Sequence, residues 1–261
     1  MSPTSGAQRL ANDARTARSS SAGNSIPHAA QATRLRAVRV DGAPQILGLS
    51  QTALRVGETA TVTVWGAGLD GDASFGPGTS AKVTGKGTGF VTLEVTADAD
   101  AKPGNRTLAI GKLKAAEPFA IYRSIDSVKV EPPLALARIG GNGGKAPKVE
   151  AQLEAIGYAN GPDGKPGTKD DIRLGAFAAT WQTAPFNAEA ERMEDVKFAG
   201  GLTAGGLFQP AGAGPNPQRH WGTNNVGDLK VTAVVNDHGR TVEGTGRAIS
   251  AVQRFIDPAI R

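Results

Sequence analysis

The chain has 261 residues, which is room for one large or two ordinary domains. It contains no cysteine, and this excludes disulfides, thiolate metal sites and cysteine nucleophiles. Its net charge of +5 resides at the start, because residues 1–40 hold six Arg and one Asp while the remainder holds 23 basic and 23 acidic residues. A nucleic-acid-binding domain would carry a basic stripe within its fold, so we expect no nucleic-acid partner.

Residues 1–42 are rich in Ser, Ala and Arg, which predicts a disordered, Arg-rich tail. Such a tail is either solvated or an arm that grips something acidic, and we favour the solvated tail. Its positive charge is not followed by an apolar stretch, so no secretory signal peptide is visible. No apolar run reaches the length of a membrane span.

Residues 43–123 alternate apolar and polar side chains in short runs separated by Gly and Pro turns. This pattern is typical of an immunoglobulin-like β-sandwich. The absence of cysteine excludes an inter-sheet disulfide, so we expect Trp65 to pack on aliphatic neighbours in the core. The predicted strands are Ala60–Gly66, Phe90–Val95, Thr107–Ile110 and Leu113–Tyr122.

Residues 124–261 repeat this spacing of short strands and predict a second β-sandwich domain. Asn236-Asp237-His238-Gly239 is a tight-turn sequence that predicts a hairpin between Val231–Val235 and Thr241–Val252. Glu189–Glu194 predicts one helical turn. The other predicted strands are Val149–Tyr158, Ile172–Leu174 and Ala178–Trp181. The expected fold class is all-β, with two immunoglobulin-like sandwiches in tandem after the tail.

The segment Asn160–Arg173 packs Gly, Pro and Asp into one loop between two apolar runs. Such a loop is either a rigid surface turn or an oxygen-rich cradle for a cation such as calcium. The carboxylates that a metal ion would use are Asp163, Asp170 and Asp171. The loop departs from the EF-hand pattern and contains two lysines, so we favour the rigid turn.

No complete catalytic constellation is present in the sequence. His28, His220 and His238 are scattered and lack a second histidine at metal-ligand spacing. The run Gly140–Gly144 lacks the spacing of a phosphate-binding loop and predicts a flexible segment. Glu191, Glu194 and the following Asp195 predict a solvated helix face.

Several segments of the second half carry a resemblance to a known family, and the first half resembles it more loosely. The segments are Ala159–Gly167, Asp170–Gly175, Ala179–Trp181, Asp195–Gly200, Gly206–Phe208, Gly214–Pro217, Asn224–Val231 and Val252–Pro258. In these segments the chain resembles the C-terminal β-domain of the alpha subunit of bacterial quinohemoprotein amine dehydrogenase. Residues 48–122 are similar to the β-domain that precedes it. The likeness covers about residues 43–261.

The resemblance implies a periplasmic assembly that oxidises amines to aldehydes. In that family, an N-terminal part of the alpha subunit carries two c-type haems, and a small partner subunit carries a cysteine tryptophylquinone. This chain has no cysteine for haem c attachment, so we expect no cofactor other than the calcium considered above. No catalytic or haem-ligating residue of the family carries over, and the chain looks like a truncated or split-off alpha subunit.

We therefore expect a non-catalytic β-scaffold that docks to haem-bearing and quinone-bearing partners, and that contributes to oxidation only within a complex. The alternative is a stand-alone extracellular module that binds a carbohydrate or a protein through its loops. Trp181, Phe208 and Trp221 would offer stacking surfaces for that alternative. Because aromatic residues are scarce here, we expect all three to fill the core instead.

Overall fold

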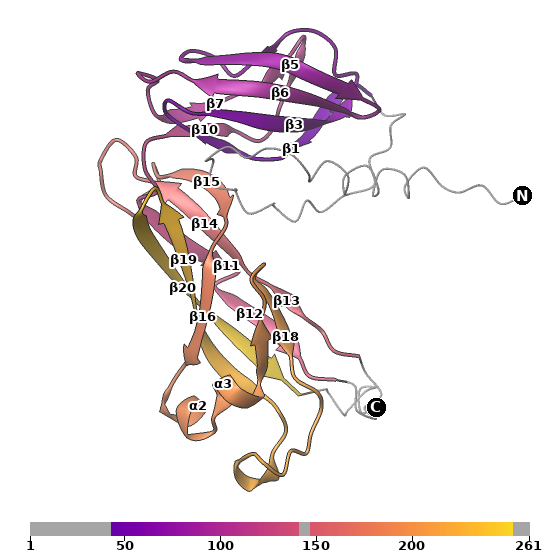
Figure 1. The fold of residues 1–261 in the computed structure, drawn as a ribbon, viewed down its shortest axis with the longest axis vertical. Coiled ribbons are helices and arrows are strands. Elements are labelled where there is room, and N and C mark those ends of the chain that lie inside the picture. The colour runs from indigo at the N-terminus through magenta and orange to yellow at the C-terminus, as the bar shows by residue number, and fades with distance from the viewer. Residues whose placement is uncertain (1–42, 141–146, 253–261) are drawn as a thin grey trace, which may run out of the picture.

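The computed structural model describes residues 43–140 and 147–252 as two β-sandwich domains that follow one another along the long axis of the molecule (Figure 1). The predicted tail 1–42, the greater part of the Gly140–Gly144 run, and the last segment of the family resemblance beyond Val252 lie outside the described residues.

The first domain consists of two main sheets and a small third one. The four-stranded sheet has the order β1 (Gln45–Leu49), β3 (Thr59–Ala67), β6 (Phe90–Ala97), β5 (Thr79–Gly87). The second has the order β2 (Ala53–Arg55), β10 (Phe119–Tyr122), β7 (Gly104–Arg106). The small sheet joins β4 (Ala73–Ser74), β8 (Ala109–Ile110) and β9 (Leu113–Lys114). The first order corresponds to strands A-B-E-D of an immunoglobulin sheet, which confirms the predicted fold class.

Alternation along β3 places Val62 and Val64 in the core of the first domain, where both are fully buried. Trp65 occupies the opposite face of the same strand and is only half-buried. The expectation that Trp65 fills the core is therefore wrong. Strand period two decides this result, because Val62 and Val64 point inward and Trp65, which directly follows Val64, must point outward.

The second domain also consists of two main sheets and a small one. One has the order β11 (Ser127–Glu131), β14 (Glu154–Ala159), β15 (Ile172–Phe177). The other has the order β12 (Leu134–Arg138), β20 (Arg240–Ala251), β19 (Gly227–Asp237), β16 (Thr180–Pro185). The small sheet joins β13 (Ala151–Gln152), β18 (Leu207–Pro210) and β17 (Gly200–Leu202). In both domains an early short strand pairs in parallel with the last strand, β2 with β10 and β12 with β20.

The two large sheets of the second domain approach each other very closely at two glycines of β20. A Cβ atom added to Gly244 would lie 2.4 Å from the carbonyl oxygen of Val128 in β11. One added to Gly246 would lie 2.8 Å from the Val130 side chain. Only glycine permits this separation, so these positions set how tightly the two sheets pack.

Two short helices close the end of the second domain that lies away from the first domain (Figure 1). They are α2 (Ala188–Arg192) and α3 (Asp195–Phe198). Asn187 caps α2, because its side-chain oxygen accepts a hydrogen bond of 2.9 Å from the backbone N–H of Ala190. The structure thus has a helix where the sequence predicts a helical turn.

The two domains meet at a joint that is built around a buried carboxylate. Asp237 ends β19 and its side chain is 3% exposed. One of its oxygens accepts a hydrogen bond of 3.0 Å from the backbone N–H of Ile125, in the segment between the domains. Arg55 of the first domain and Arg240 of the second lie 3.4 and 3.3 Å from its oxygens. Asp237 therefore ties both domains and their linker together.

Apolar contacts complete this joint. The Tyr122 ring of the first domain packs edge-on against Phe177 of the second, with centroids 6.1 Å apart. Thr52 donates a hydrogen bond of 2.9 Å to the carbonyl oxygen of Leu174. Burial, with the nearby Glu58 and Asp237 carboxylates, raises the pKa of Tyr122, so its hydroxyl stays protonated. The core of the second domain consequently extends into the end of the first.

Several predicted strands are present with different bounds. The hairpin β19–β20 turns at His238 and Gly239, within the predicted turn. The predicted strand Leu113–Tyr122 is interrupted after Lys114 and resumes at Phe119. Strand β5 was not expected, because its sequence contains Gly85 and two lysines. A register shift between Val83 and Gly85 shows that it is an irregular edge strand, which explains its weak signal.

Candidate functional site

The Asp/Gly loop connects β14 to β15, and its three carboxylates face its own backbone. The N–H groups of Asp163, Lys165 and Gly167 donate hydrogen bonds of 3.3, 2.8 and 2.7 Å to Asp170, Asp163 and Asp171 respectively. The Thr168 hydroxyl lies 2.7 Å from Asp170 and 3.2 Å from Asp171. The loop is thus held by side-chain oxygens that accept from its own donors.

The hydrogen bonds of this loop depend on glycine at one position and on an ionised carboxylate at another. A Cβ atom at Gly161 would lie 2.1 Å from a carboxylate oxygen of Asp170, so no larger residue fits there. The Thr168 hydroxyl and the Asp163 N–H stabilise the charged form of Asp170 and lower its pKa. Asp170 therefore stays ionised under conditions in which an isolated aspartate begins to take up a proton.

The structure brings Asp163, Asp170 and Asp171 into one loop, as a cation site requires. Asn160 adds a buried side-chain oxygen that has no hydrogen-bond partner. Within residues 43–140 and 147–252, however, no group of three or more His, Asp or Glu side chains is arranged to hold a metal ion. The assignment of these three aspartates to calcium stays a prediction.

The histidines and acidic residues outside this loop have separate environments. His220 is exposed, whereas His238 lies in the β19–β20 turn with its Nε2 atom 3.1 Å from a Glu58 oxygen. Glu191 and Glu194 are exposed. His28 lies outside the described residues. These residues do not come together into one site.

Asp195 is buried, which corrects the expectation that it belongs to a solvated helix face. Its carboxylate forms an ion pair with Arg219, and both side chains are almost fully buried. The other carboxylate oxygen accepts a hydrogen bond of 2.8 Å from the backbone N–H of Asp228. Burial raises the pKa of Asp195, while these hydrogen bonds act in the opposite direction. No local sequence pattern predicts this pair, because its members come from separate segments.

Arg219 also fixes the loop of residues 211–226, in which it lies. Its guanidinium donates to the carbonyl oxygens of Asn224, at 2.9 Å, and of Val226. The backbone N–H of Asn216 donates a hydrogen bond of 3.0 Å to Thr223, which closes the loop. This loop is therefore tied to α3 by a buried ion pair and to itself by backbone hydrogen bonds.

Phe208, Trp181 and Trp221, which were expected in the core, differ in how deeply they are buried. Phe208 is fully buried and Trp181 packs partly buried against the core of the second domain. Trp221 is 70% exposed in the loop 211–226, which corrects the prediction for that residue. The Arg192 guanidinium lies 4.6 Å from its ring centroid, and the His220 ring centroid lies 4.1 Å away.

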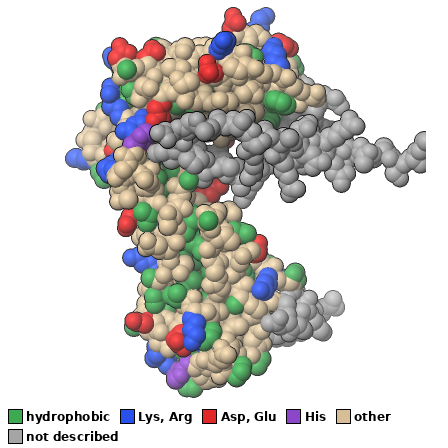
Figure 2. All heavy atoms as spheres, in the orientation of Figure 1, with side chains coloured by type: hydrophobic (Ala, Val, Ile, Leu, Met, Phe, Trp, Pro, Cys, Tyr) green, Lys and Arg blue, Asp and Glu red, His purple; other side chains and the backbone are tan. Residues whose placement is uncertain are grey.

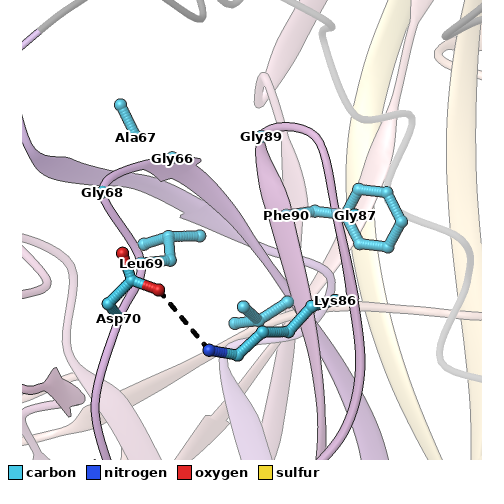
Figure 3. Close-up of a pocket in the computed structure, with 10 residues that line it drawn as sticks. Gly66, Ala67, Gly68, Leu69, Asp70, Lys86, Gly87, Gly89 and Phe90 are labelled. Carbon is cyan, nitrogen blue, oxygen red and sulfur yellow. Dashed lines mark hydrogen bonds and ion pairs between the residues drawn. The ribbon is translucent and has the colours of Figure 1, made fainter.

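A small pocket opens at one end of the first domain, between β3, β5 and β6 (Figure 3). Its volume is about 210 Å³, which is below the range of usual ligand pockets. Backbone of Gly66, Gly68 and Gly87 forms much of its lining. Lys86 points toward Asp70 across it, and the two lie 3.5 Å apart. The pocket thus offers a surface ion pair and backbone groups rather than a nucleophile.

On the face shown in Figure 2, Lys and Arg are interspersed with Asp and Glu instead of forming a stripe of one sign. Among the helices in the described part of the chain, none has the length and apolarity that crossing a membrane demands.

These observations define a class of protein: a pair of tandem immunoglobulin-like sandwiches with a hydrogen-bonded joint at Asp237 and two short helices at the far end of the second domain. Covalent haem c requires cysteine thiols, and the sequence has none, so the residues of this chain do not fit that cofactor.

The chain belongs to the quinohemoprotein amine dehydrogenase alpha subunit family. Residues 43–123 match the model for quinohemoprotein amine dehydrogenase, alpha subunit domain III. Residues 128–260 match the model for alpha subunit domain IV. The resemblance stated from the sequence is thereby confirmed.

Three of the solved structures that are similar to this chain have low sequence identity to it. Extracellular cadherin domains 1–5 of protocadherin gamma B2 are 16% identical, with a TM-score of 0.32, over 84% of this chain and 42% of that one. Human protocadherin-24 EC1-2 is 13% identical, with a TM-score of 0.26, over 82% of this chain and 99% of that one. A chimeric titin Z1Z2 is 16% identical, with a TM-score of 0.26, over 82% and 100%. A search of curated proteins found no match.

Proposed function

We propose that this chain is a non-catalytic β-scaffold that docks onto haem-bearing and quinone-bearing partner subunits of a periplasmic amine dehydrogenase. The observation that carries the proposal is the match of successive alpha-subunit domains III and IV in a chain without cysteine. A polypeptide with these domains and without haem attachment would support partner subunits structurally and would not itself carry haem c.

The joint around Asp237 supports a scaffold role. A scaffold that holds two partners in register must not bend between its domains. Here a buried carboxylate accepts hydrogen bonds from both domains and from their linker, and aromatic rings pack beside it. Such a network resists bending, because opening it would break the hydrogen bonds of Asp237 and expose the apolar rings packed beside it to water.

Reconstitution tests this proposal. The purified chain is mixed with purified haem-bearing and quinone-bearing subunits of an amine dehydrogenase, and sedimentation velocity measures complex formation. We expect a complex with one or both subunits. The chain alone should give no amine-dependent dye reduction. Turnover of an amine by the isolated chain, or its failure to bind either subunit, would contradict the proposal, and periplasmic fractionation of the producing cell tests the location.

A stand-alone binding module remains the second candidate, and the exposure of Trp221 favours it. An aromatic platform for a sugar needs an open ring face, yet Arg192 and His220 already contact this ring. We therefore place protein docking first. Binding of the chain to a defined glycan on an array, with loss of that signal on replacement of Trp221, would reverse the order.

A further inference from the structure

The end of the second domain that lies away from the joint presents an exposed tryptophan on a fixed loop. We define this tip as α2, α3 and the loop 211–226. In Figure 2, hydrophobic and charged side chains of both signs gather at this end, where Figure 1 places α2 and α3. Besides Trp221, the exposed large apolar side chains here are Val196 on α3 and Phe186 just before α2.

The tip holds Trp221 in an unfavourable backbone conformation. Its φ of 57° and ψ of 20° lie in the left-handed region, which costs an ordinary residue about 1–2 kcal/mol. The buried Arg219–Asp195 pair and the carbonyl contacts of Arg219 fix the loop on either side of it. The indole is thus presented already ordered, and a partner would not have to order it on binding.

The lysine and arginine side chains of the tip are paired with carboxylates of the tip. The bidentate contact between Arg192 and Glu189 has N–O distances of 3.0 and 2.5 Å, and it lowers the pKa of Glu189. Lys197 lies 3.4 Å from Glu194, and Arg219 is buried against Asp195. The three Lys and Arg residues of the tip therefore all have carboxylate partners. An anionic polymer or lipid surface needs unpaired cations, so this surface does not suit one.

We propose that the tip docks into a neutral, apolar pocket on a protein subunit, with Trp221 as the anchor that enters the pocket. Tryptophan dominates binding where it enters a desolvated pocket, and surrounding paired charges form a polar rim that excludes water. The proposal rests on the scaffold function above and assigns a surface to it.

The test uses the full chain and the purified haem-bearing and quinone-bearing subunits as probes. Trp221→Asn removes the indole while keeping a residue that tolerates the left-handed backbone. The matched control is Leu136→Asn on β12, a side chain that is 63% exposed and lies outside the tip. We expect Trp221→Asn to weaken binding by about 30-fold or more, and Leu136→Asn to change it by less than about twofold.

Two further readouts accompany the affinity. Binding should shift the Trp221 fluorescence to shorter wavelength, because the indole leaves water. The affinity should change little between about 0.05 and about 0.5 M salt, since the cations of the tip are paired and contribute weakly. Equal binding of parent and Trp221→Asn would overturn the tip assignment and leave the scaffold function standing. Equal weakening by both variants would also overturn it. If the parent chain binds neither subunit, the scaffold function fails and the tip assignment fails with it.

Discussion

Single residues decide whether the Asp/Gly loop is ordered. Thr168 offers one hydroxyl proton, and three carboxylates lie within 3.5 Å of its oxygen. The second oxygens of Asp170 and Asp171 accept hydrogen bonds from the backbone N–H groups of Asp163 and Gly167, and the Asp163 oxygen near Thr168 also accepts one from Lys165. The order of this segment therefore depends on ionised aspartates rather than on apolar burial.

Acidification should open this loop through Asp170. Its pKa is lowered in the folded protein, so its contribution to stability is complete above the ordinary aspartate value and is lost as the pH falls through the folded value. Hydrogen exchange of the Asp163 amide, which donates to Asp170, should accelerate in that window. Thr168→Val removes the hydroxyl and should move the acceleration to higher pH. An unchanged exchange profile in Thr168→Val would contradict this account.

Calcium titration distinguishes the two interpretations of the same residues. Because the carboxylates already accept hydrogen bonds from the loop, we expect isothermal titration calorimetry with calcium to give no binding heat. The control is a double variant, Asp163→Ala with Asp171→Ala. Heat in the parent that the double variant abolishes would assign Asp163, Asp170 and Asp171 to a metal site.

At the scale of elements, the packing of two sheets depends on where glycine interrupts a strand. Strand β20 carries Gly244 and Gly246 on its inward face, against β11. From the sequence alone, these glycines are expected to destabilise the strand, because glycine has no side chain to pack. In the structure they are the contact surface, because the carbonyl oxygen of Val128 takes the place of a side chain.

Gly244→Ala should destabilise the second domain by about 3 kcal/mol, since the new methyl group would overlap backbone of β11. Urea unfolding measures this loss of free energy. Gly201→Ala in β17 is the matched control, because an added Cβ there meets nothing within 4 Å. If both variants unfold at the same urea concentration, the close approach of the two sheets is not a stability determinant.

At the scale of the whole molecule, the joint makes one body of two domains. The core of the second domain includes Ala53, Ala120 and Tyr122 of the first, so neither domain buries its end alone. Asp237 adds a polar centre to this apolar contact. The joint thus combines an apolar contact with a hydrogen-bonded carboxylate.

Asp237→Ala should uncouple the two domains. It leaves Arg55 and the Ile125 N–H without their acceptor, which costs about 3 kcal/mol for a broken buried ion pair. We expect differential scanning calorimetry to show two transitions in place of one cooperative transition. Asp70→Ala is the control, because its ion pair with Lys86 is exposed and contributes little. A single transition in both variants would show that Asp237 does not couple the domains.

Much of the fold was predictable from local pattern, and the failures have physical causes. Alternation revealed β3 and β6, and a tight-turn sequence revealed the β19–β20 hairpin. The edge strand β5 was not predicted, because its register shift and its two lysines interrupt the alternation of apolar and polar residues. Trp65 was assigned to the core because the domain has no inter-sheet disulfide, although the alternation along its strand places it on the outward face.

The candidate sites likewise divide into those formed by residues close in sequence and those formed only by folding. Asp163, Asp170 and Asp171 were predictable because they are neighbours in one loop. The Arg219–Asp195 pair was not, since 24 residues separate its members and only the folded second domain brings them together. The exposure of Trp221 likewise depends on that pair.

By itself, the sequence determined the all-β class, the family, the loop chemistry and the impossibility of covalent haem c, because each depends on residue type and local spacing. The tertiary structure alone decided which carboxylates are buried, how the domains are joined at Asp237 and that Trp221 lies at the free end. Burial and pairing across segments follow from how distant strands pack, and no local pattern encodes that.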